Sequence, residues 1–223
     1  MKNGGNDPAV FAERRLGLGV DPRTKLVKII PELERESVIL LPTDTIYGIS
    51  CRWDSQAARD RVQRLKGPDR LAFFVALISD REMAFRYAEQ PSLECMEVLD
   101  SAWPGPVTAI LRLRPHAAPD FCASPEGTLA FRLPNSACLQ ELVQGVGVPI
   151  VSTSANRTGE SHADSAEAAW KIFGDGMDLY VDAGPQEALP STLVDLTRDR
   201  PRLLRVGLQA LRGLTVEGDP YRE

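Results

Sequence analysis

Short groups of hydroxyl and amide side chains stand at the ends of apolar stretches in this chain. They are Thr43-Asp44-Thr45 after the apolar run 38–41, Ser152 to Asn156 after the run 148–151, and Ser191-Thr192 before the run 193–196. Such side chains pair with phosphate or carboxylate oxygens. Open α/β sheets usually bind their ligands at strand ends, so the pattern predicts an anion site there. A polar turn without a ligand explains any one of these groups equally well.

Three cations add to this pattern because each stands at the end of an expected element or inside an apolar strand. Lys66 ends a helix just before an apolar run, Arg132 lies close to the end of a strand, and Arg205 lies within an apolar strand. A buried arginine needs a partner or an anionic ligand, so Arg205 is more informative than a surface charge. Arg132, taken alone, is also compatible with an ordinary edge charge.

Several common kinds of active site are absent from the sequence. His116 and His162 are the two histidines, which leaves no three-histidine metal site. No G-x-x-x-x-G-K-[ST] or G-x-G-x-x-G motif occurs, and the four cysteines have no C-x-x-C spacing, so we expect buried free thiols. What remains suits an anionic nucleotide and a small polar partner that react by positioning and charge stabilisation, without a covalent nucleophile.

Composition limits the class of protein. The chain has 223 residues, of which 43% are hydrophobic and 26% charged, and this is enough for a core that needs no disulfide or metal. The formal net charge of −5 argues against a broad surface for nucleic acid. No apolar run approaches the roughly 20 residues that span a bilayer, and no signal peptide is evident, so we expect a cytoplasmic protein without membrane contact.

Hydrophobic periodicity and capping residues predict alternating helices and strands. Helices are expected over 22–34 (with Pro31 kinking or dividing it), 55–66, 80–88, 91–103, 136–143 and 165–173, and strands over 38–41, 73–78, 107–113, 128–133, 148–151, 179–182, 193–196 and 203–206. In the second helix, Ala58, Val62 and Leu65 are expected to face the core. Arg59, Arg61 and Arg64 are then expected to form a solvated basic face.

Seven short motifs carry a family resemblance. They are P-T-D-T-I-Y-G at 42–48, L-K-G at 65–67, W-P-G-P-V-T at 103–108, F-R-L-P at 131–134, S-T-S-A-N at 152–156, P-S-T-L-V-D-L at 190–196 and L-L-R-V-G at 203–207. The motifs occur in the same order as in the Sua5/YrdC/YciO family, which the sequence therefore resembles. The resemblance implies a YrdC-like α/β fold, a twisted mixed sheet with flanking helices around a positively lined cavity. This domain would cover residues 23–210, between an N-terminal extension (1–22) and a C-terminal tail (211–223).

The best-known members of that family are threonylcarbamoyl-AMP synthases. The resemblance implies that L-threonine, bicarbonate and ATP give threonylcarbamoyl-AMP and pyrophosphate, the first step toward t6A at position 37 of transfer RNAs that read codons starting with A. By motif position, threonine would be held by Thr43, Arg132, Ser152 and Ser191, and ATP by Lys66, Thr128, Ser154, Asn156 and Arg205. Lys66 and Arg132 would be the catalytic residues. Mg²⁺ would arrive with ATP, without a metal site of the protein's own. Transfer RNA or the downstream t6A-transfer proteins would be further partners.

One departure from the family pattern keeps other functions open. Family members usually carry K-x-R after the second helix, whereas here Lys66 is followed by Gly67 and Pro68, and Ala72-Phe73 stands where Lys-Pro is usual. Arg70 is the nearest cation that can compensate. A second departure is Val206 in place of a proline. The alternatives are a divergent paralogue that binds ATP but has a different or lost activity, and an RNA-binding module, against which the net acidity counts.

Overall fold

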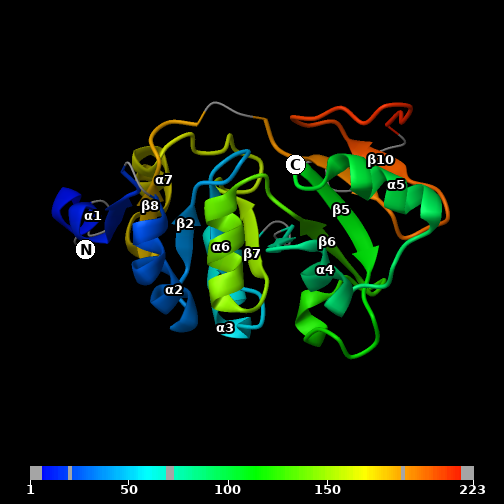
Figure 1. Ribbon diagram of the computed structural model, residues 1–223. Helices are drawn as coiled ribbons and strands as arrows, with labels where there is room; N and C mark the ends of the chain where they lie inside the picture. Colours follow the sequence, from blue (N-terminus) through cyan, green and yellow to red (C-terminus); the bar gives the residue numbers. More distant parts are fainter. Residues whose placement is uncertain (1–6, 20–21, 69–72, 187–188, 217–223) are drawn as a thin grey trace.

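The computed structural model of the protein describes residues 7–19, 22–68, 73–186 and 189–216. Its described strands form one mixed sheet in the order β1-β8-β2-β3-β7-β4-β6-β5-β9-β10, from the left end of Figure 1 to the right. The strands are β1 (Arg15–Gly17), β2 (Ile39–Leu41), β3 (Gly48–Arg52), β4 (Val75–Leu77), β5 (Val107–Arg112), β6 (Thr128–Arg132), β7 (Ile150–Ser154), β8 (Leu179–Asp182), β9 (Thr192–Asp195) and β10 (Arg202–Arg205). The twisted mixed sheet expected from the sequence is confirmed.

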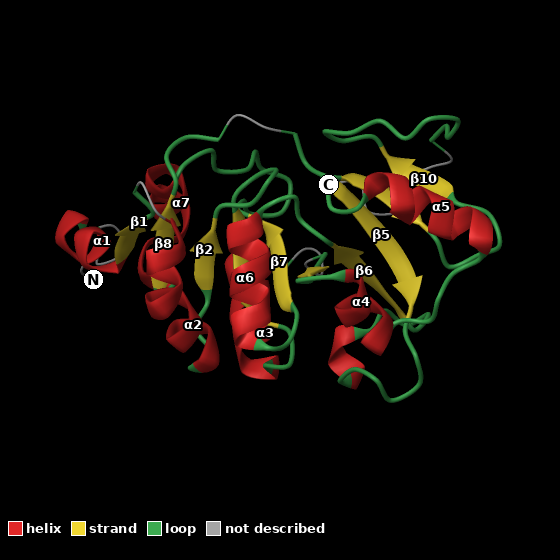
Figure 2. Ribbon diagram, viewed as in Figure 1, coloured by secondary structure: helices red, strands yellow, loops and turns green. Residues whose placement is uncertain are grey.

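Helices flank this sheet (Figure 2). They are α1 (Pro8–Arg14), α2 (Leu26–Glu34), α3 (Gln56–Lys66), α4 (Arg81–Tyr87), α5 (Leu93–Ala102), α6 (Ala137–Val146) and α7 (Ala166–Phe173), with short 3-10 turns at η1 (Pro22–Lys25), η2 (Asp120–Cys122) and η3 (Gly174–Gly176). Helices α2 and α6 pack side by side in front of the sheet. No helix in these described segments is long and apolar enough to cross a membrane.

Local capping chemistry places the helix starts. The hydroxyl groups of Ser55, Ser136 and Ser165 accept hydrogen bonds from backbone N–H groups three residues on, at the first turns of α3, α6 and α7. These starts agree with the predictions. Helix α2 runs through Pro31 without dividing, and its buried residues Ile29 and Leu33 anchor it to the core on both sides of the proline.

Two short strands were missed in the sequence analysis. Strand β3 follows the P-T-D-T motif and pairs antiparallel with both β2 and β7. Strand β1 lies in the expected N-terminal extension, yet it pairs parallel with β8 and so joins the same sheet. The proposed division of the chain at residues 22 and 210 remains a prediction.

The expectation that Arg59 faces solvent is wrong. Arg59 on α3 is only 9% exposed, and its guanidinium lies over the rings of Phe74 and Phe121, at 4.4 and 5.6 Å from their centroids. Nη2 of Arg59 also donates to the Phe121 carbonyl at 3.1 Å. Its neighbour Arg64 is exposed, as expected. The attraction of a cation to two ring faces explains why an arginine is buried at this position.

The cysteines are free in the described structure. Cys51, Cys95 and Cys122 are buried, and Cys138 is half-buried. Burial raises the pKa of the Cys51 thiol to about 12 and that of Cys122 to about 11. The expectation of buried free thiols is confirmed for Cys51, Cys95 and Cys122, whereas Cys138 is only half-buried.

Candidate functional site

The two arginines singled out from the sequence line one cavity. Arg132 and Arg205 approach it from β6 and β10, which lie on opposite sides of β5 and β9 in the strand order. The cavity measures about 90 Å³. Predicted site residues among its lining are Thr43, Arg132, Ser152, Ser154, Ser191 and Arg205. The sheet thus brings together six of the positions that the sequence analysis had chosen.

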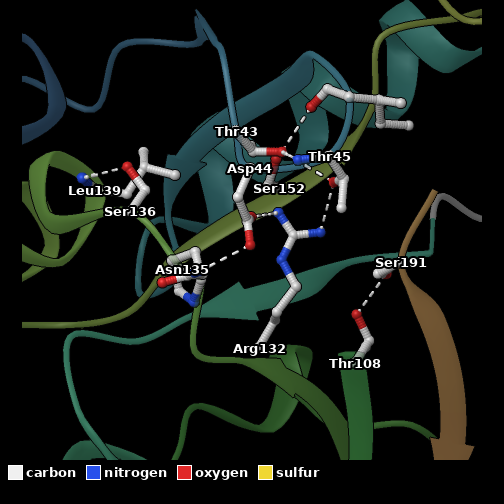
Figure 3. A network of polar contacts seen from close by, with 12 residues as sticks. Thr43, Asp44, Thr45, Thr108, Arg132, Asn135, Ser136, Leu139, Ser152 and Ser191 are labelled. Carbon is white, nitrogen blue, oxygen red and sulfur yellow. Dashed lines mark hydrogen bonds and ion pairs between the residues drawn. The ribbon is translucent and has the colours of Figure 1, made fainter. Parts of the chain in front are cut away.

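Arg132 is held by the loop that follows β2 (Figure 3). Its Nη2 lies 3.1 Å from Oδ1 of Asp44, and its Nη1 donates to the Thr45 hydroxyl at 2.9 Å. Oδ2 of Asp44 accepts from the backbone N–H of Asn135 at 2.9 Å, just beyond β6. Arg132 is 6% exposed, and this burial lowers the pKa of its guanidinium while the Asp44 carboxylate raises it. A buried ion pair therefore fixes the direction of Arg132.

The Thr43 hydroxyl organises the same loop. It donates to the Ile46 carbonyl at 2.7 Å and accepts from the Thr45 N–H at 3.1 Å. These bonds form a tight turn directly after β2, as expected where Pro42 ends a strand. On the neighbouring strand pair, the Ser50 hydroxyl donates to that of Ser152 at 2.9 Å. The hydroxyl groups that face the cavity are therefore oriented by the protein itself.

Ser191 and Arg205 line the opposite wall of the cavity, and Thr108 contacts Ser191. The hydroxyl groups of Thr108 and Ser191 lie 2.7 Å apart, a pair that is visible at the right of Figure 3. Nη2 of Arg205 donates to the Ser191 carbonyl at 3.2 Å. Among the described residues, neither the Nε of Arg205 nor that of Arg132 has a hydrogen-bond partner, although both atoms are buried. A buried N–H group without a partner favours a ligand that supplies a hydrogen-bond acceptor.

Gly207 allows the chain after β10 to approach this wall. A Cβ at this position would lie 2.1 Å from the Pro190 carbonyl oxygen and 2.5 Å from the Ser191 carbonyl carbon, both backbone atoms. We therefore expect Gly207→Ala to separate Ser191 from Arg205, lowering turnover about tenfold or more with a loss of thermal stability. Turnover and thermal unfolding measure these effects. Gly17→Ala is the control, because its Cβ would meet nothing within 4 Å. Parent-like behaviour of Gly207→Ala would contradict the expectation.

Lys66 lies beside the cavity, at the end of α3. Its Nζ donates to the Ser154 carbonyl at 3.0 Å, to the Ser154 hydroxyl at 3.2 Å and to Oδ1 of Asn156 at 2.8 Å. Lys66 is 3% exposed and Asn156 is 1% exposed. The structure thus brings together three of the predicted ATP-binding residues. Their contacts with one another indicate that Lys66 positions the end of β7.

Other expected positions lie elsewhere. Thr128 stands at the opposite end of β6 from Arg132, and its hydroxyl lies 2.8 Å from that of Ser124. It lines a separate, larger cavity. Arg70 falls outside the described residues, so its compensating role stays a prediction. Asp44 was not predicted as the partner of Arg132, although a buried arginine signals such a partner. His162 was not predicted either, and it lines the cavity.

Known proteins resemble this chain in both sequence and fold. A family model for Sua5, YciO and YrdC, described as "Telomere recombination", matches residues 32–207. The chain belongs to the Sua5/YciO/YrdC family. This confirms the resemblance found in the motifs. A relative from Enterobacter sp. (strain 638), named threonylcarbamoyl-AMP synthase, is 30% identical over 184 residues, which are 81% of this chain and 96% of that protein.

Solved structures of the Sua5/YciO/YrdC family share the fold. YciO of E. coli superposes with a TM-score of 0.79 at 22% identity, covering 89% of this chain and 96% of that one. Sua5 of P. abyssi in complex with L-threonine gives a TM-score of 0.77 at 24% identity and covers 86% of this chain. The match spans 56% of the Sua5 chain, so Sua5 has a large part that this match does not include.

Proposed function

We propose that this protein is a threonylcarbamoyl-AMP synthase. The observation that carries the proposal is the pair of guanidinium groups, Arg132 and Arg205, that line one cavity and whose buried Nε atoms have no hydrogen-bond partner among the described residues. Two fixed cations suit two anionic ligands, an amino-acid carboxylate and a triphosphate. Further support comes from the synthase name of the Enterobacter relative, which matches this chain over 96% of its own length.

The residues around the cavity have distinct roles in this proposal. Arg132, fixed by Asp44 and Thr45, pairs with the threonine carboxylate, and the hydroxyl groups of Thr43, Ser152 and Ser191 surround the threonine. Arg205 pairs with the phosphates of ATP. The threonine amine and bicarbonate then form a carbamate with loss of water, and a carbamate oxygen displaces pyrophosphate from the α-phosphorus. Proximity and charge stabilisation are the sources of catalysis, because no covalent nucleophile is needed.

Magnesium fits this site as a companion of ATP. Among the described residues that line the cavity there is no carboxylate, and the nearby Asp44 is paired with Arg132. Mg²⁺ prefers oxygen ligands and usually binds through substrate phosphates, so the triphosphate would hold it. When bound, the ion would neutralise phosphate charge while Arg205 and Ser154 orient the nucleotide. Transfer RNA modification would consume the product.

Pyrophosphate release from ATP tests the proposed function. We expect release that requires both L-threonine and bicarbonate, and a product with the mass of threonylcarbamoyl-AMP. Omission of either co-substrate is the control. Pyrophosphate release that does not depend on threonine, or no release at all, would contradict a synthase with this acceptor.

A divergent ATP-binding paralogue is the second candidate, favoured by Gly67-Pro68 where the family usually has K-x-R. If the protein is a synthase, Arg70 replaces the missing arginine. We then expect Arg70→Ala to weaken ATP binding by about 1 kcal/mol or more, and Pro68→Arg to strengthen it. Calorimetric titration with ATP measures both, with the exposed Arg64→Ala as control. Unchanged binding in both variants would favour the paralogue over the synthase.

A further inference from the structure

One residue of the cavity that Arg132 and Arg205 line has no role in the reaction as described above, and this residue is His162. His162 is half-buried, and none of the hydrogen bonds and ion pairs among the described residues involves its ring. The ring is therefore available to a ligand in the cavity. Histidine is also the side-chain type that most readily accepts and releases a proton near neutral pH.

The loop after β7 fixes the position of His162. The backbone N–H of the next residue, Ala163, donates to the Ala155 carbonyl at 2.8 Å, and both alanines are buried. Inside the loop that this bond closes, Nδ2 of Asn156 donates to the Glu160 carbonyl at 2.8 Å. The loop therefore returns to the end of β7 and holds His162 in the wall of the cavity.

The proposed reaction needs a proton acceptor at this place. The amine of threonine is mostly protonated at neutral pH, and an ammonium group has no lone pair with which to attack the carbon of bicarbonate. One proton must therefore leave the ammonium group before the N–C bond of the carbamate forms. A side chain that accepts this proton inside the cavity increases the fraction of bound threonine that can react.

The other described ionisable side chains of the cavity wall are poorly suited to accept that proton. Arg132 and Arg205 are cations, and guanidinium groups keep their proton in proteins. The Tyr47 hydroxyl donates to the Gly184 carbonyl at 2.8 Å, and burial raises its pKa, so it stays a neutral phenol. The part of the wall that the structure describes contains no carboxylate. Among these residues, His162 is therefore the one base.

Ionisable groups close to the cavity have other partners or are exposed. The Asp44 carboxylate is paired with the Arg132 guanidinium at 3.1 Å, and protonation would break this pair, which makes the carboxylate a weak base. The Lys66 ammonium group donates hydrogen bonds to the end of β7. Glu160 and Asp164, on the loop after β7, are exposed. These surroundings leave the histidine of this loop as the proton acceptor.

We propose that His162 is the general base that takes one proton from the threonine ammonium group. The inference rests on the proposed function, because threonine and bicarbonate are the reactants. After this transfer the amine nitrogen attacks the carbon of bicarbonate, and the bicarbonate hydroxyl leaves with a second amine proton as water. The carbamate that forms displaces pyrophosphate from ATP, and the protonated His162 returns its proton to solvent.

The pH dependence of turnover in a histidine variant tests this base. His162→Asn keeps a planar polar side chain that cannot accept a proton, and we expect threonine-dependent pyrophosphate release to fall about a hundredfold or more at neutral pH. The deficit should shrink as the pH rises, because free amine then forms without a base. ATP binding, measured by calorimetric titration, is expected to be unchanged. The matched control is His116→Asn, because His116 is exposed and has a φ of 59°, which asparagine tolerates.

Added imidazole provides an independent readout. His162→Ala leaves space in the cavity wall, and we expect free imidazole in solution to restore part of its turnover. Pyrazole has the same ring shape but is a much weaker base, so it should restore little. Thermal unfolding of each variant shows whether it is folded under the conditions of the assay.

The outcomes separate this inference from the proposed function. A deficit in His162→Asn that shrinks with rising pH, together with rescue of His162→Ala by imidazole, supports the base. Parent-like turnover of folded His162→Asn overturns the inference and leaves the synthase proposal standing, as does a deficit that is equal at every pH and is not rescued. Failure of both variants to fold makes His162 a structural residue and overturns the inference too. Absence of threonine-dependent release in the parent overturns the synthase proposal and the inference with it.

Discussion

Replacement of Arg132 by methionine is expected to lower threonine-dependent turnover at least a hundredfold. In the proposed function the guanidinium is the planar, two-donor partner for the threonine carboxylate, and methionine supplies similar bulk but no charge. Arg132 is buried and is oriented by Asp44 and Thr45, so its donors have a fixed direction before a ligand binds. A charge-assisted pair in such a site is a large part of substrate binding.

The same substitution is also expected to destabilise the fold, which differs from the expectation based on the sequence alone. From sequence, an arginine at a strand end contributes to function more than to stability. In the structure its removal leaves the Asp44 carboxylate, 9% exposed, without its cation. An uncompensated buried charge costs about 3 to 5 kcal/mol. We therefore expect a clear drop in the melting temperature of Arg132→Met.

A second substitution separates the two effects. Asp44→Asn in the Arg132→Met background removes the stranded charge and retains an oxygen that can accept from the Asn135 N–H. We expect the double variant to recover most of the thermal stability while its turnover stays as low as that of the single variant. Thermal unfolding and threonine-dependent pyrophosphate release measure the two quantities. Recovery of turnover together with stability would mean that Arg132 only neutralises Asp44 and does not bind substrate.

Local chemistry explains which parts of the fold were predictable from sequence. Ser55, Ser136 and Ser165 cap helices through atoms three residues away, so a short window contains the whole signal. Strand β1 covers three residues and is defined by its pairing with β8, more than 160 positions along the chain. No period can be recognised in three residues, and its partner cannot be chosen from sequence.

In the site too, the sequence indicated which types of residue are used, but it did not indicate which residues pair with one another. From the sequence, Arg132 was also compatible with an ordinary edge charge, and its pairing with Asp44, one of 31 acidic residues, is decided by the turn after β2. Arg59 was placed on the solvent side by helical periodicity. Its burial depends on Phe121, a residue 62 positions away that no helical pattern includes. The partners and the burial of these two arginines therefore depend on tertiary contacts that the local sequence does not show.

Lys66→Met is the second substitution with a large expected effect. Three hydrogen bonds of the ammonium group run to the end of β7, at Ser154 and Asn156. The Lys66 backbone carbonyl also accepts from the N–H of Thr158 at 3.1 Å, which ties α3 to the segment after β7. Methionine retains the packing of the aliphatic stem and the backbone bond, but it removes the three hydrogen bonds of the ammonium group. We therefore expect a loss of about 2 to 4 kcal/mol in the free energy of unfolding.

The expected loss of turnover in Lys66→Met is larger than the loss of stability explains. Ser154 lines the same cavity as Arg132 and Arg205, and its hydroxyl and carbonyl both accept hydrogen bonds from Lys66. Without that anchor the hydroxyl no longer has a fixed direction in the cavity, where the proposed function places the phosphates of ATP. We therefore expect turnover to fall about a hundredfold even at temperatures where the variant is fully folded. Turnover measured well below the melting point, with the exposed Arg64→Met on the same helix as control, tests this. A folded Lys66→Met protein with parent-like turnover would show that Lys66 only supports the fold, since a residue that positions Ser154 for catalysis cannot be removed without affecting the reaction.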